Sequence, residues 1–237
     1  MVKRRNGGFT IVELMLAVAF LSVLLLAIAM LAIQAGSVYQ RGITLRMVNQ
    51  SSRELSDSLR RDFLQAKTDR VIPRVIDIQH GGTVIGGRIC LGSYSYVWNT
   101  AQAIDSRAVE LTTFTDGTPI NAVRVYDPGA NFCELTSDGG YEKTVNPNQA
   151  TQLLRSRQNP DDVTVALYAV SLQKVLQATH ATAAEGLYRI RFTLGTGRVD
   201  ETELINTART CKPPSNIDSN IEACAVNQFE MIVRTNG

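Results

Sequence analysis

Residues 9–33 read FTIVELMLAVAFLSVLLLAIAMLAI, a long and almost uninterrupted apolar stretch of the 237-residue chain. From Leu14 to Ile33 it holds twenty residues without a charge, interrupted only by the hydroxyl of Ser22. At about 1.5 Å per residue, a helix of about twenty residues spans the roughly 30 Å hydrocarbon core of a bilayer. The stretch therefore predicts a membrane-spanning helix.

A short basic segment, MVKRRNGG at positions 1–8, precedes the apolar stretch. Its positive charges should stay in the cytoplasm, which would place the chain after Gln34 on the far side of the membrane. An ordinary secretory signal is cut after its apolar region, at small residues. Here the Gly8–Phe9 junction lies before that region, and the apolar run is too long for an ordinary signal core.

Glu13 puts a carboxylate near the start of the apolar stretch. A charged side chain there costs roughly 2.5 kcal/mol at the bilayer centre and less near the interface, so it needs a partner. Cleavage after Gly8 would leave a positively charged α-amino group on Phe9, about one helical turn away. In a bundle of such helices, Glu13 of one subunit can neutralise the Phe9 amine of its neighbour and set the axial register. The alternative is that Glu13 extends to the headgroup region.

The segment GGFTIVELMLAVAF resembles the class III signal of type IV pilins and pseudopilins. The resemblance implies that a prepilin peptidase cuts after Gly8 and methylates Phe9, and that Glu13 serves subunit assembly. It further implies other pilins as partners through their N-terminal helices, with an inner-membrane platform protein and a cytoplasmic ATPase driving assembly. One departure is Met30, which stands where many major pilins have a mid-helix proline.

After Gly42 the sequence becomes amphipathic. Apolar or small residues recur at steps of three and four, with charged residues between them: Leu45, Val48, Ser52, Leu55, Leu59 and Phe63. This pattern predicts that the helix continues from about Phe9 to about Thr68 and packs its second half on the chain's own sheet. A coiled-coil partner helix is the competing interpretation. Pro73 marks the end of the helical pattern.

Short apolar or β-branched runs alternate with turn signals in the remainder of the chain. The predicted strands are Val71–Ile78, Thr83–Val97, Ala108–Phe114, Ala122–Tyr126, Val163–Leu172, Leu187–Leu194 and Phe229–Arg234. A short helix is predicted at Gln173–Ala184 and a loop at Pro147–Asn159. The fold class is α+β and pilin-like, with the long helix on an antiparallel sheet. The expected divisions are a leader (1–8), an assembly helix (9–35), its amphipathic continuation (36–70) and a β-rich head (71–237).

Four cysteines lie beyond the membrane stretch: Cys90, Cys133, Cys211 and Cys224. None forms a C-x-x-C pair, and an even number in an exported domain favours disulfides, although four reduced thiols are the alternative. Four cysteines allow three pairings. Resemblance to the disulfide-bounded C-terminal loop of many pilins favours Cys211–Cys224, with Cys90–Cys133 as the second pair.

Composition and motifs give little support to nucleic-acid binding or catalysis. Three of the 24 basic residues lie in 1–8, so the remaining 21 face 22 acidic residues, and aromatic residues are only 6%. GGTVIGG and LGTGR lack the spacing of nucleotide loops, and neither G-x-S-x-G nor H-E-x-x-H occurs. His80 and His180 are interpreted as surface or structural residues, and VDETE at 199–203 as a solvated turn. We expect no enzyme activity, cofactor or metal.

The segment LSDSLRRDFLQA at positions 55–66 is similar to PilW-type minor pilins and to J-type secretion pseudopilins. The resemblance implies a structural minor pilin that primes assembly or sits near the tip of a pilus. A minor pseudopilin of a type II secretion or competence DNA-uptake system is the alternative, and a membrane-anchored periplasmic enzyme or sensor is a remote one. The expected location is the inner membrane, with the head outside, and then the fibre at the cell surface.

Overall fold

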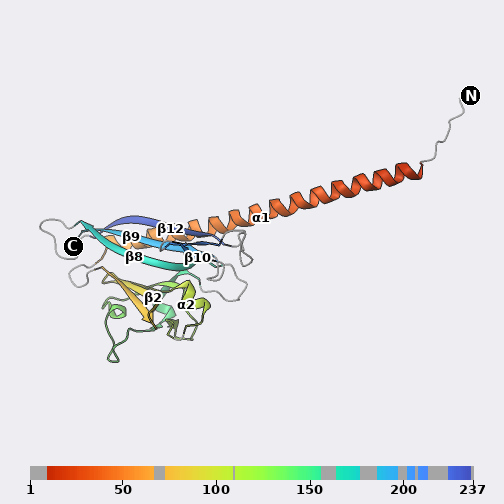
Figure 1. Ribbon diagram of the computed structural model, residues 1–237. Helices are drawn as coiled ribbons and strands as arrows, with labels where there is room; N and C mark the ends of the chain where they lie inside the picture. Colours follow the sequence, from red (N-terminus) through yellow and green to blue (C-terminus); the bar gives the residue numbers. More distant parts are fainter. Residues whose placement is uncertain are drawn as a thin grey trace, which may run out of the picture.

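The computed structural model describes residues 10–66, 73–108, 110–155, 164–176, 186–196, 202–205, 208–212 and 224–235. Figure 1 shows one long helix, α1 (Ile11–Leu64), whose N-terminal part projects away from a strand-rich head. The C-terminal part of α1 runs alongside the strands of the head and contacts β12, β7 and β9. The protein is therefore α+β, with a long helix packed on antiparallel sheet, as the sequence predicts.

The buried side of α1 follows the predicted amphipathic stripe. Val48 and Phe63 are fully buried, and Leu55 and Leu59 are nearly so. Leu45, at the start of the predicted stripe, keeps 36% of its surface exposed, whereas the adjacent Thr44 is 5% exposed, so the buried side of the helix passes through Thr44 and not through Leu45. The buried positions of α1 therefore all lie in its C-terminal part, from Thr44 to Phe63.

The larger sheet has five antiparallel strands in the order β1-β2-β3-β5-β7. These strands are β1 (Val75–His80), β2 (Thr83–Cys90), β3 (Tyr94–Asn99), β5 (Ala122–Tyr126) and β7 (Ala150–Leu154). A second antiparallel sheet has the order β12-β9-β8, with β8 (Ala166–Leu176), β9 (Gly186–Gly195) and β12 (Val226–Thr235). Its three strands lie beside α1 in Figure 1.

Smaller elements complete the described part of the head. The short parallel pair β4 (Thr113–Phe114) and β6 (Thr144–Val145) and the antiparallel pair β10 (Thr202–Ile205) and β11 (Ala208–Cys211) form two further sheets. The short helices are α2 (Ala101–Asp105), η1 (Asn131–Cys133) and η2 (Pro147–Gln149).

The five-stranded sheet is covered by apolar side chains on both faces. On one face it shares the main core with α1 and the three-stranded sheet, through residues such as Trp98, Phe63 and Phe192. On the other face a smaller cluster forms from Val97, Phe114, Ile120, Val123, Val125 and Val145. Burial on both faces explains why residues 85–90 of β2 and 95–99 of β3 are buried at every position.

Most of the predicted strands are present, with shifted boundaries. Ala122–Tyr126 coincides with β5, and the runs near residues 166, 187 and 229 correspond to β8, β9 and β12. The prediction of one strand over Thr83–Val97 is wrong. The chain forms β2 and β3 instead, because it reverses at Leu91–Ser93, where Gly92 adopts a positive φ of 84°.

Three other predictions need correction. Gln173–Leu176, assigned to a helix, continues β8 because it pairs with β9; positions 177–184 lie outside the described residues. The predicted loop Pro147–Asn159 contains η2 and β7, and positions 156–159 are not described. Within the predicted strand Ala108–Phe114, only Thr113–Phe114 is strand among the described residues.

Candidate assembly helix and its attachment to the head

The N-terminal half of α1 presents an apolar surface that nothing in the described chain covers. Ile11 is 78% exposed, Phe20 68% and Ile33 72%. Among the described residues, α1 is the one helix that is long and apolar enough to cross a membrane. A surface of this size and composition requires lipid or other apolar helices around it. With a disulfide-bonded head, it is typical of a single-pass or secreted protein with an extracytoplasmic domain.

Thr10 and Glu13 form a capping box at the start of α1. The backbone N–H and the hydroxyl of Thr10 both donate to Glu13 Oε2, each at 2.9 Å, and the Glu13 N–H donates to Thr10 Oγ1 at 3.3 Å. The T-x-x-E spacing is the sequence signature of this motif. It is a role of Glu13 that the pattern of charge and hydropathy alone did not predict.

The capping box leaves part of the Glu13 carboxylate available. Oε2 accepts both bonds from Thr10, whereas Oε1 has no hydrogen bond to any described residue. Gly8 and Phe9, the predicted cleavage and methylation residues, lie outside the described residues. The carboxylate can thus hold the first turn of α1 and still accept a donor from another molecule.

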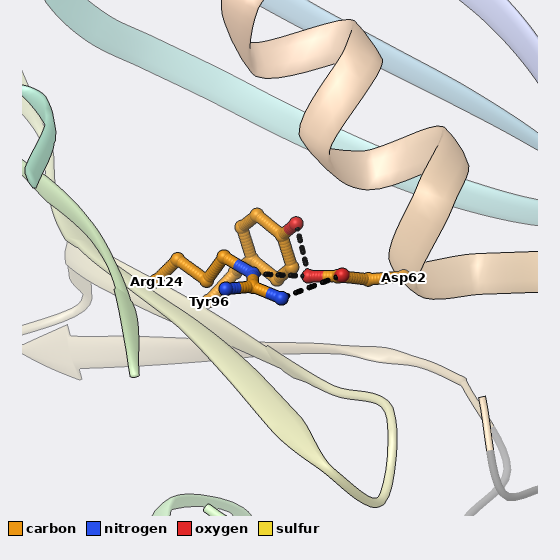
Figure 2. Close-up of polar contacts among 3 residues, drawn as sticks. All are labelled: Asp62, Tyr96 and Arg124. Carbon is orange, nitrogen blue, oxygen red and sulfur yellow. Dashed lines mark hydrogen bonds and ion pairs between the residues drawn. The ribbon is translucent and has the colours of Figure 1, made fainter. Parts of the chain in front are cut away.

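Asp62 fixes the other end of α1 to the five-stranded sheet (Figure 2). Arg124 of β5 donates from Nε to Asp62 Oδ2 at 2.5 Å and from Nη2 to Oδ1 at 2.8 Å. The hydroxyl of Tyr96 on β3 donates to Oδ2 at 2.7 Å. We call these three residues the helix–head clasp. A bidentate arginine–carboxylate pair fixes orientation as well as distance.

Burial makes the clasp electrostatically strong. The Asp62 side chain is only 5% exposed and that of Arg124 24%. Burial and the neighbouring Asp62 charge raise the pKa of Tyr96 well above its ordinary value, and hydrogen bonding to Asp62 raises the pKa of Arg124. The guanidinium of Arg124 also lies over the ring of Tyr94, 3.3 Å from its centroid. Each carboxylate oxygen of Asp62 therefore accepts at least one hydrogen bond.

Both predicted disulfides are present in the structure. Cys90 of β2 bonds Cys133 of η1, which we call the β2–η1 disulfide, and Cys211 bonds Cys224, the C-terminal disulfide. Cys211–Cys224 is the pair that the resemblance to pilins favoured, and Cys90–Cys133 is the predicted second pair. Positions 213–223 of the C-terminal loop lie outside the described residues.

A buried carboxylate positions the η1 turn that carries Cys133. Asp127 is 3% exposed, and it accepts from the backbone N–H groups of Asn131 and Phe132 at 2.9 and 3.2 Å. It also accepts from the Ser95 hydroxyl at 2.7 Å. These bonds replace the water that the carboxylate loses on burial and hold η1 over the end of β2.

The remaining sequence candidates do not come together. His80 is half exposed, with Nδ1 3.6 Å from Glu110, and His180 lies outside the described residues. Of the acid-rich segment, positions 199–201 are not described, and Thr202 begins β10. In the described part of the chain no group of three or more His, Cys, Asp or Glu side chains could hold a metal ion.

No family model, curated protein or solved structure matches the chain. Its likeness to a pilin therefore rests on architecture: a long N-terminal apolar helix, exposed over its first half and packed by its second half on antiparallel sheet.

Proposed function

We propose that the chain is a structural minor pilin, which a prepilin peptidase processes and which enters a type IV pilus as a priming or tip-located subunit. The observation that carries the proposal is the division of α1. Its first half is exposed, apolar and begins with Glu13, whereas its second half is fixed in a disulfide-bonded head. An apolar helix that the head leaves uncovered suits lipid first and a bundle of similar pilin helices later.

The proposed mechanism uses the start of α1. Insertion with the basic leader inside the cell would present the Gly8–Phe9 junction to the peptidase, which cuts it and methylates the new amine. Extraction from the bilayer needs energy, which we assign to the assembly ATPase and its membrane platform. In the fibre, the Phe9 amine of one subunit would meet Glu13 of the next, through the oxygen that Thr10 leaves available. The role of the chain is structural, and we propose no catalytic activity.

Mass spectrometry of the intact, membrane-purified chain tests the proposal first. A chain that starts at methylated Phe9 only when the peptidase is present supports it. A chain that starts at Met1 under both conditions overturns it and makes a membrane-tethered domain the better interpretation. Replacing Gly8 by a bulkier residue should leave the uncut, slightly larger form in the membrane.

Variants of Glu13 separate its two roles. Glu13→Val removes the charge and the two bonds that Thr10 donates to the Glu13 side chain, and should permit cleavage but impair incorporation into sheared fibres. Glu13→Gln keeps an acceptor for the Thr10 donors but loses the charge. If the charge pair drives incorporation, the Gln variant should be as defective as the Val variant. Normal incorporation of the Gln variant would refute the charge pair while leaving the processing route intact.

The similarity of residues 55–66 to J-type pseudopilins supports a second candidate, a minor pseudopilin of a secretion system. Fractionation distinguishes the two. A minor pilin should be recovered with sheared surface fibres, whereas a pseudopilin should remain with the cell envelope, and its deletion should block protein export rather than fibre formation.

A further inference from the structure

The edge strand β7 of the five-stranded sheet carries no charge. Its sequence is Ala-Thr-Gln-Leu-Leu, and it pairs only with β5 among the described strands. The other outer strands of the two larger sheets all carry charges: Asp77 in β1, Lys174 in β8, and Glu230 and Arg234 in β12. Because charges on edge strands prevent pairing with other chains, β7 is the least protected of these edges.

A cleft of about 240 Å³ lies beside β7, between this strand and the last turns of α1. Ser58, Arg61 and Gln65 line it from the helix, and Thr151 and Leu153 line it from β7. Asp62 and Arg124 of the helix–head clasp complete its wall. The cleft therefore combines hydroxyl, amide and guanidinium groups with one half-buried leucine.

The charge of the cleft is not balanced. Asp62 and Arg124 neutralise each other, with both oxygens of the carboxylate occupied. Arg61 is exposed, and its guanidinium has no ion pair with any described residue. One positive charge thus faces the cleft, and the group that fits it is a carboxylate, which arginine can bind through two parallel hydrogen bonds.

We propose that β7 and this cleft bind an extended, acidic segment of a neighbouring fibre subunit. The proposal rests on the proposed function, since it takes the neighbour to be another subunit. The incoming segment would add as a strand to β7, with its backbone bonded along Ala150–Gln152 and a carboxylate on Arg61. The regular ladder between β5 and β7 slips at Leu153, so the added strand would be short. The carboxylate therefore supplies the specificity that a few backbone bonds lack.

A photo-crosslinking residue in place of Gln152, in the full chain expressed in its own cells, tests the proposal. Gln152 is exposed on β7, and the same residue in place of Gln173 is the matched control, because Gln173 is an exposed glutamine on the edge strand β8. We expect an adduct from position 152, and peptide sequencing should place it within two or three residues of an Asp or Glu in another subunit.

Charge reversal provides the second readout. Arg61→Glu should lower the yield of the adduct about tenfold, because it sets two carboxylates against each other. Arg60→Glu is the control: Arg60 is equally exposed on the same turn of α1 but does not line the cleft. Equal loss in both variants would overturn the proposal, as would an adduct to a segment without a carboxylate. An adduct between two β7 strands would also overturn it, since β7 has no acidic residue.

Failure of this proposal and failure of the proposed function give different results. If the chain enters fibres but position 152 forms no adduct, the docking site is wrong and the fibre role stands. If the chain starts at Met1 and never leaves the membrane, yet position 152 forms the Arg61-dependent adduct, the cleft binds a partner and the fibre role is wrong.

Discussion

Replacing Asp62 by asparagine removes the charge of the helix–head clasp with almost no change in side-chain volume. The carboxylate accepts three hydrogen bonds at 2.5–2.8 Å, whereas an amide offers one oxygen and turns two donors toward Tyr96 and Arg124. Removing one partner of a buried ion pair costs about 3–5 kcal/mol when the other charge stays buried. Arg124 is 24% exposed and regains some hydration, so we expect Asp62→Asn to lower the unfolding free energy by about 2–3 kcal/mol.

Trp98 makes this loss measurable. It is the one tryptophan of the chain, is 5% exposed, and belongs to the core that α1 shares with both larger sheets. Urea titration of the disulfide-bonded chain in detergent, followed by Trp98 fluorescence, gives the unfolding free energy of the head by linear extrapolation. The variant should shift the midpoint to lower urea without changing the slope.

Asp57→Asn is the matched control, because Asp57 is exposed on the same helix, one turn before Arg61, and forms no ion pair with a described residue. It should leave the unfolding free energy within about 0.5 kcal/mol of that of the original chain. If Asp62→Asn behaves like Asp57→Asn, the clasp contributes nothing measurable to stability and the reasoning is refuted.

Three further predictions concern the head. The pKa of Tyr96 is raised in the folded chain, whereas the ordinary pKa of a tyrosine hydroxyl is about 10. Above about pH 10 the unfolded chain therefore loses the Tyr96 proton while the folded chain keeps it, so the unfolding free energy should fall as the pH rises. In Tyr96→Phe the unfolding free energy should depend less on pH in this range, and an unchanged pH dependence would contradict the prediction. Gly87→Ala should cost about 1–3 kcal/mol in a urea titration, because the added methyl group overlaps the ring of Trp98, whereas Gly42→Ala, in open space on α1, should not destabilise. Replacing both cysteines of a disulfide by serine should lower the unfolding free energy by about 4 kcal/mol for the β2–η1 disulfide and by about 3 kcal/mol for the C-terminal disulfide, because the two close loops of 43 and 13 residues. A larger loss of thermal stability without the C-terminal disulfide would contradict the loop-entropy argument.

The local sequence pattern was sufficient to predict α1. Its apolar run and the three- and four-residue spacing of Val48, Leu55, Leu59 and Phe63 report burial on one side of a helix directly. β5 was also predictable, because a short β-branched run is bounded by turn residues on both sides. In these elements the neighbours along the chain carry enough information to fix the structure.

Pairing with distant strands decided the elements that the sequence did not predict. Gln173–Leu176 has good helix formers, but it extends β8 because β9 provides partners at Arg189, Tyr188 and Leu187. Likewise, β7 follows residues that do form a turn, η2, and its five residues become a strand through pairing with β5. Propensity is worth only a few tenths of a kcal/mol per residue, so a ladder of backbone bonds overrides it.

The helix–head clasp could be predicted only in part. Asp62 is visible in the sequence as a charge beside the apolar stripe of Leu59 and Phe63, which signals a buried partner. Its partners, however, lie 34 and 62 residues further along, and both sit in apolar-rich strands where a tyrosine and an arginine are unremarkable from sequence alone. The position of β3 and β5 under the end of α1 is the information that was missing.

Glu13 and Asp62, at opposite ends of α1, would have complementary consequences for the proposed subunit, which its N-terminal half would hold in the fibre. At about 1.5 Å per residue, the 54 residues of the helix extend about 80 Å, with Glu13 near one end and Asp62 near the other. Any load on the head must pass into the helix through its buried C-terminal part. Hydrophobic burial is non-directional, so it resists separation better than sliding along the axis. The bonds from Arg124 and Tyr96 to Asp62 are directional, so axial slip of the helix would lengthen or bend them and weaken them. The clasp therefore sets where the head sits along the helix, as the proposed Phe9–Glu13 pair would set where the helix sits in the fibre.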